Sequence, residues 1–135
     1  MPEQKTLERA RKAKREGKAP STQAGEFVRE EIEHVREGKH GARSTKQVIA
    51  IGLSKARRAG VKLPPPAKGE TSERTRKSAA RAYRRGQSGT HKQPSARRSR
   101  AMTRKLKGES TRVASRTALS KQARSAARRR RQAKE

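Results

Sequence analysis

Residues 44–66 specify a complete helix, with a start, a body and a stop. Ser44 is followed three residues later by Gln47, which is the capping-box spacing. In that motif the serine oxygen accepts from the Gln47 amide, and the Gln47 side chain reaches back to the Ser44 amide. Gly60 suits the left-handed conformation that ends a helix, and the prolines at 64–66 exclude any continuation. The pattern predicts a helix over residues 44–59.

The predicted helix has a wide apolar face. Its apolar and small side chains cover an arc of roughly 140°, which Ile51 widens to roughly 200°; the narrower arc holds Val48, Ile49, Gly52, Leu53, Ala56 and Ala59. The opposite face carries Lys46, Arg57 and Arg58. That face either offers arginines to an anion or is simply solvated. An apolar arc this wide needs a second partner, either another helix of the chain or a second copy of it.

Residues 21–38 form the one net-acidic segment and predict the partner helix. Ser21 or Thr22 is its expected cap and Gly38 its expected stop. A short connection containing Gly41 leads into the second helix, so an antiparallel hairpin of one acidic and one basic helix is expected. Apolar residues recur at helical spacing, with Phe27 beside them, and they are Ala24, Val28, Ile32 and Val35.

Composition limits how much more of the chain can fold. Only 27% of the 135 residues are hydrophobic, Phe27 and Tyr83 are the aromatic residues, and the net charge is +27. Such chains bury too little apolar surface to offset the entropy of ordering. The sequence therefore predicts an all-α protein in which a short helical hairpin is flanked by largely disordered basic tails.

The expected organisation has four segments. They are a basic N-terminal arm (1–20), the hairpin (21–63), a Pro-started linker that allows a helix over 70–86 (64–108), and an Arg/Ala/Ser-rich basic tail (109–135). At an offset of 66 residues, Ser110 and Thr111 align without gaps on Ser44 and Thr45. The copy is polar where the original is apolar, so chance similarity and an internal repeat both remain open.

No catalytic site, metal site or cofactor is expected. A catalytic serine needs a fixed general base beside it, in a pocket that excludes water. The chain lacks the hydrophobic core needed to build such a pocket. His34 has Glu30, Glu31 and Glu37 at helical spacing, but no further ligand is suggested. The longest apolar run, residues 48–53, is far too short to span a membrane, and no signal-peptide pattern is present. An intracellular protein that is not an enzyme is expected.

The excess of 39 basic over 12 acidic residues predicts a polyanionic partner. Bulky anchors for a membrane surface are missing, and so are the aromatic platforms of RNA-recognition folds, since Tyr83 is a single ring in a basic run. DNA is therefore favoured over RNA, with binding through phosphates. The candidate contacts are Lys46, Lys55, Arg57, Arg58, Arg97, Arg98, Arg100, Arg104, Arg124, Arg128, Arg129, Arg130 and Arg131.

The motif GKHGARSTKQVIAIGLSKARRAGVKLPPP, residues 38–66, resembles a family of small, very basic, uncharacterised bacterial proteins. Some of its members carry labels such as plasmid stabilisation or DNA-binding protein. The resemblance covers residues 21–66. The basic tail resembles the family only in its general Arg/Ala/Ser-rich character. It implies a bacterial, cytoplasmic setting, and with DNA as the partner the nucleoid is the expected location.

Three functions remain open at this point. The favoured one is a nucleoid-associated protein that compacts DNA or maintains plasmids, with a homodimer through the hairpin covering Ile51 and bridging DNA. The second is an RNA- or ribosome-associated basic protein. The third is a protein-interaction module, in which the acidic helix and the wide apolar arc bind a protein partner.

Overall fold

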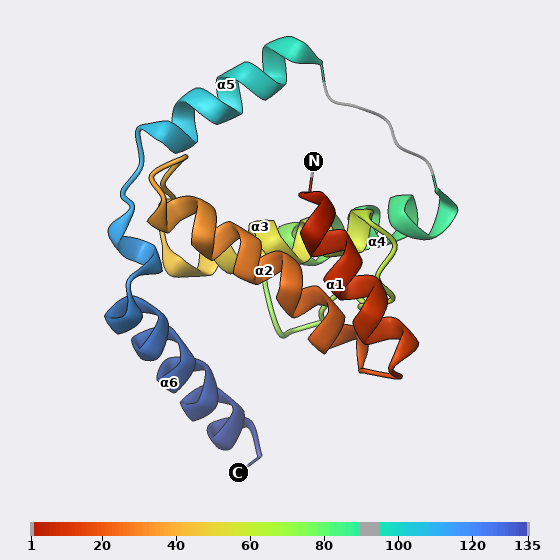
Figure 1. The fold of residues 1–135 in the computed structure, drawn as a ribbon. Coiled ribbons are helices and arrows are strands. Elements are labelled where there is room, and N and C mark those ends of the chain that lie inside the picture. Colours follow the sequence, from red (N-terminus) through yellow and green to blue (C-terminus); the bar gives the residue numbers. More distant parts are fainter. Residues whose placement is uncertain (1, 90–94, 135) are drawn as a thin grey trace. The chain divides into compact units, whose positions relative to one another are not determined.

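A computed structural model describes residues 2–89 and 95–134, and over these residues the protein is all-α (Figure 1). The prediction of an all-α protein is confirmed. Over the described residues the elements are α1 (Gln4–Arg15), α2 (Pro20–Arg36), α3 (Thr45–Arg58), α4 (Glu73–Ser88), α5 (Ala96–Lys107), the 3₁₀ turn η1 (Arg112–Ala114) and α6 (Arg116–Ala133). None of these helices is long and apolar enough to cross a membrane.

The prediction of a short hairpin with disordered tails is wrong, because α1 lies in the basic arm and α5 and α6 lie in segments expected to be disordered, while α4 lies where a helix over residues 70–86 was allowed. Two physical reasons explain the difference. Serine caps start three of these helices: the hydroxyls of Ser72, Ser95 and Ser115 each accept from an amide three residues on. The helices themselves are rich in Ala and Arg, which have high helix propensity, so they form with few bulky apolar residues.

The chain divides into two compact units. Unit 1 comprises Met1–Glu31 and Ala50–Pro94, and unit 2 comprises Ile32–Ile49 and Ser95–Glu135. The boundary falls within α2 and within α3, so each of these helices contributes to both units. Each unit therefore joins part of the predicted hairpin to segments that the sequence had assigned to an arm, a linker or a tail.

The core of unit 1 lies among α1, the first part of α2, the second part of α3 and the chain that follows α3. A Cβ atom on Gly52 would lie 2.6 Å from the Cα atom of Val28, so α3 crosses α2 at close range. Helix α4 joins the end of α3, since a Cβ atom on Gly86 would overlap the carbonyl oxygen of Arg57. The buried residues are Ala10, Ala24, Phe27, Ala56 and Val61, with Leu7, Leu53 and Leu63 packed against them.

The apolar arc of α3 is thus met by other helices of the same chain. Ile51, expected to be left over, is half-buried. The exposed side chain that motivated a homodimer is therefore absent, and the homodimer itself stays a prediction.

Unit 2 is held together largely by hydrogen bonds to the backbone that links α5 to α6. The Gly41 amide donates to the Leu106 carbonyl (2.7 Å), and the Ala42 amide donates to the Ser110 carbonyl (2.9 Å). A side chain on Gly41 would overlap the carbonyl oxygen of Glu109, so the two segments are in direct contact. Val35, Ala42, Val48 and Ala114 form the small core beside these bonds.

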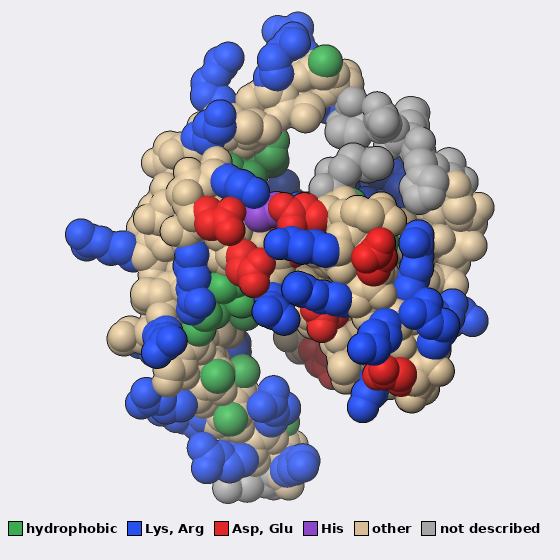
Figure 2. All heavy atoms as spheres, in the orientation of Figure 1, with side chains coloured by type: hydrophobic (Ala, Val, Ile, Leu, Met, Phe, Trp, Pro, Cys, Tyr) green, Lys and Arg blue, Asp and Glu red, His purple; other side chains and the backbone are tan. Residues whose placement is uncertain are grey.

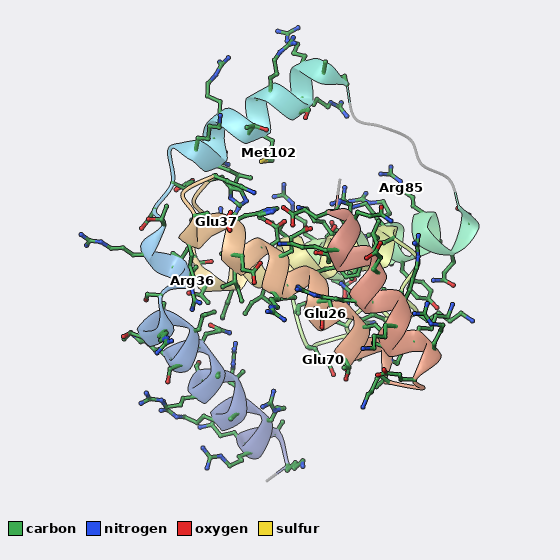
Figure 3. All side chains as sticks on the ribbon, viewed as in Figure 1. Glu26, Arg36, Glu37, Glu70, Arg85 and Met102 are labelled. Carbon is green, nitrogen blue, oxygen red and sulfur yellow. The ribbon has the colours of Figure 1, made fainter. Side chains whose placement is uncertain are left out.

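Two side chains, from α2 and α3, also bind the connection between α5 and α6. Thr45 Oγ1 donates to the Val113 carbonyl (2.6 Å), and Arg36 Nε donates to the Ala114 carbonyl (2.8 Å). Figure 3 labels Arg36 at the end of α2. The α5–α6 connection is therefore fixed without large apolar side chains, which is why hydrophobic periodicity did not predict it.

The start and stop of α3 are confirmed in most details. Ser44 Oγ accepts from the Gln47 amide (3.2 Å), and Gly60 has a φ of 99°. The Val61 amide donates to the Ala56 carbonyl, as expected for a chain that folds back onto the helix. The second half of the capping box differs, because the Gln47 side chain accepts from the Arg43 amide (2.6 Å) instead of the Ser44 amide.

The starts of α2 and α4 differ from the sequence prediction, and the start of α6 bears on the suggested repeat. Helix α2 begins at Pro20, one or two residues before the expected caps, because proline is preorganised for the first turn. Helix α4 begins at Glu73, after Ser72, and continues through Gly86. Helix α6 begins at Arg116, so it does not share the register of the suggested repeat, in which a helix would follow Ser110.

Candidate nucleic-acid interface

Lys55 is used inside unit 1. Its ammonium group contacts the Glu31 carboxylate and lies 3.6 Å from Glu30 Oε2, and both glutamate side chains are only 1% exposed. Glu30 Oε1 also accepts from the Glu3 amide (2.6 Å). Lys55 thus compensates the charge of two buried carboxylates. Its own positive charge is therefore not available for contact with a phosphate group.

Arg57 is also turned inward. It is 7% exposed, with Nε donating to the Leu63 carbonyl (3.2 Å) and a terminal nitrogen donating to the Pro64 carbonyl (3.1 Å). Burial lowers the pKa of its guanidinium. It forms part of the lining of an open pocket of about 560 Å³, together with Leu53 and Leu63. Its bonds hold the start of the proline segment against the end of α3.

Arg58 and Lys46 remain exposed. Arg58 Nε donates to the Ser54 carbonyl of its own helix (3.4 Å). Neighbouring protein atoms partly desolvate the Arg58 side chain, and this desolvation, followed by the positive charge of Arg85 on α4, lowers the pKa of Arg58. Of the four predicted residues on α3, the structure therefore leaves these two at the surface, Lys46 in unit 2 and Arg58 in unit 1.

The predicted residues of α5 and α6 are all exposed: Arg97, Arg98, Arg100, Arg104, Arg124, Arg128, Arg129, Arg130 and Arg131. Figure 2 shows Lys and Arg side chains standing out from each of these two helices. Neither helix contains an acidic residue. Their cations are consequently available to an external anion.

A regular spacing orders these cations. Lys or Arg residues at relative positions 0, 3, 7 and 10 share an arc of roughly 80° and a length of about 15 Å on a helix. We call each such row a basic stripe. The α5 stripe is Arg97, Arg100, Arg104 and Lys107, and the α6 stripe is Lys121, Arg124, Arg128 and Arg131, all of them exposed.

Helix α4 carries the same pattern, with Arg74, Lys77, Arg81 and Arg84 forming its exposed stripe. The packed face of α4, marked by the buried Ala79 and Ala82 and by Gly86, lies on the opposite side at helical spacing. Glu73 is paired with Arg76 beside the stripe (2.7 Å), and this hydrogen bond lowers the pKa of Glu73. Tyr83 is half-buried, which reduces its value as a stacking platform.

The sequence analysis missed seven of these exposed cations: Arg74, Lys77, Arg81, Arg84, Arg85, Lys107 and Lys121. Most of them can be identified from the spacing of Lys and Arg at relative positions 0, 3, 7 and 10, in rows that start at positions 74, 97 and 121. This spacing was overlooked because the segments after residue 86 were treated as a disordered tail, and the allowed helix over 70–86 was not searched for rows of cations.

Comparison with known proteins found one family model that is similar to part of the chain. Residues 3–68 match a family of unknown function, DUF6496. The DUF6496 match covers α1, α2, α3 and the following loop, and it ends before α4. It agrees with the resemblance to an uncharacterised family, while the three striped helices lie beyond it. No curated protein and no solved structure matches the chain.

Proposed function

We propose that this protein binds duplex DNA through the phosphate backbone, using the basic stripes of α5 and α6 in unit 2. The observation that carries the proposal is the shared spacing of exposed Lys and Arg on two helices without an acidic residue. Lys and Arg rows of this kind neutralise phosphates and release counterions, which gives affinity without base recognition.

The charge of unit 2 supports the same proposal. Its sequence contains 19 Lys and Arg residues and 4 Glu residues. Such an excess repels itself in the free protein, and a polyanion relieves the repulsion. A role in the bacterial nucleoid, in DNA compaction or in plasmid maintenance is the cellular setting that we propose for this activity.

The proposal is tested by removing one stripe. The variant changes Lys121, Arg124, Arg128 and Arg131 to Gln, and the control changes Arg11, Lys12, Lys14 and Arg15 of α1 to Gln. Both lose four positive charges, and all eight side chains are exposed. If the stripe contacts four phosphates, the slope of log K against log salt becomes shallower by about 3 to 4 in the stripe variant.

The control is expected to change that slope by less than about 1. Equal losses in the two variants would show that net charge alone matters, and would overturn the assignment to α6. Tighter binding to double-stranded RNA than to duplex DNA of equal length and at equal salt would replace DNA by RNA as the partner.

A further inference from the structure

Unit 1 carries a basic surface of its own. The α4 stripe ends in Arg84, and Arg85 follows at 20° from the first residue of the stripe on a helical projection, so it extends the same row. Figure 3 labels Arg85 on α4. This surface lies in a different compact unit from the stripes of α5 and α6.

The contact between α3 and α4 brings Arg58 near Arg85, the last cation of this row. Gly86, next to Arg85, is in contact with the carbonyl of Arg57, next to Arg58. The side-chain amide of Gln87 donates to the Gly60 carbonyl (3.1 Å), which fixes the ends of the two helices together. The fold therefore holds two guanidinium groups, from different helices, at one junction.

Among the described residues, no acidic group offsets the charge of this pair. Within residues 2–89 and 95–134, no carboxylate lies at salt-bridge distance from Arg58 or Arg85. The positive charge of Arg85 repels that of Arg58. Two like charges held together are unfavourable in the free protein. A phosphate group between them would turn the repulsion into two charge-assisted hydrogen bonds.

We infer that one chain binds two duplex segments at once, one through Arg58, Arg85 and the α4 stripe of unit 1, and the other through unit 2. This inference rests on the proposed DNA binding by unit 2. It makes the protein a DNA bridge as a monomer, so that no dimer through the hairpin is needed for compaction.

The test is a bridging assay with the full chain. A biotinylated duplex is fixed on beads, and capture of a second, labelled duplex of unrelated sequence is measured with and without protein. The variant changes Arg58, Arg84 and Arg85 to Gln, and the control changes Arg9, Arg11 and Lys14 of α1, in the same unit, to Gln. Matching circular dichroism and melting curves verify that both variants are folded.

The wild type and the control are expected to capture the second duplex. The variant should lose capture by about tenfold or more, because the second attachment is removed, while its affinity for a single duplex in solution stays within about threefold of the control. Capture by the variant at the wild-type level overturns the inference. So does a wild type that sediments as a dimer under the assay conditions and loses capture when diluted to a monomer. Failure of the wild type to bind a single duplex would instead overturn the proposed function.

Discussion

At the scale of single residues, Gly41 is the position where the least change should have a large effect. A Cβ atom there would overlap the backbone of Glu109, so Gly41→Ala has to displace the α5–α6 connection from the loop before α3. We expect a loss of about 1 to 3 kcal/mol in the free energy of unfolding. Gly25→Ala is the control: it lies on the exposed side of α2 with open space around it, and should stabilise by about 0.5 to 1 kcal/mol. Urea unfolding of both variants measures the difference, and a neutral Gly41→Ala would contradict the docking of this connection.

Lys55 gives a second residue-scale prediction. Lys55→Met leaves the carboxylates of Glu30 and Glu31 buried without their cation, and should destabilise the protein by about 3 kcal/mol. Lys46→Met removes the same charge from an exposed position and should change stability by less than about 0.5 kcal/mol. Thermal unfolding distinguishes them, and similar melting temperatures for the two variants would mean that the buried pair is not stabilising.

The same residues show what the sequence reveals and what it conceals. Spacing predicted the buried Ala24 and Val35, because apolar residues repeat at helical intervals, whereas Phe27, which is also buried, was placed only beside that row. It gave no sign that Glu30 and Glu31 are buried, since adjacent glutamates on a helix have the pattern of a solvated face. It also did not show that Lys55 and Arg57 are turned inward, because a basic side chain looks the same in sequence whether it meets a phosphate or a buried carboxylate.

At the scale of elements, the helices of the hairpin were predicted and a helix was allowed at α4, whereas α1, α5 and α6 lie in segments expected to be a basic arm or disordered. Helix α3 has a serine cap, an apolar face and a glycine stop, so each local signal agrees. Helices α5 and α6 have no buried residue among those described, and α4 buries only alanines. The sequence signals for these three helices are their serine caps and their alanine content. The overall composition, which indicates disorder, was given more weight than these signals.

An element-scale prediction follows for the free protein. Its far-ultraviolet circular dichroism should show that more than half of the chain is helical before any DNA is added, because the helices are capped and rich in Ala and Arg. Addition of duplex DNA should change the helical signal little. A coil-like spectrum that becomes helical only with DNA would contradict this structure and restore the disordered tails.

At the scale of the whole molecule, the division into two units changes the expected mechanism. The sequence suggested one hairpin that dimerises to bridge DNA, since a hairpin alone seemed too small to be stable. The structure instead completes each unit with helices from the same chain. That completion was hidden because the contacts of Gly41, Ala42 and Thr45 go to backbone carbonyls, which any sequence provides.

The salt dependence of binding to two unrelated duplexes of equal length tests the central claim most directly. If about 6 to 10 phosphates are engaged, the affinity for both duplexes should fall together by roughly 10³ to 10⁵ between about 50 and 200 mM salt. This result would establish binding through phosphates without base recognition. A shallow salt dependence, or a preference for one duplex that persists at the higher salt concentration, would contradict it.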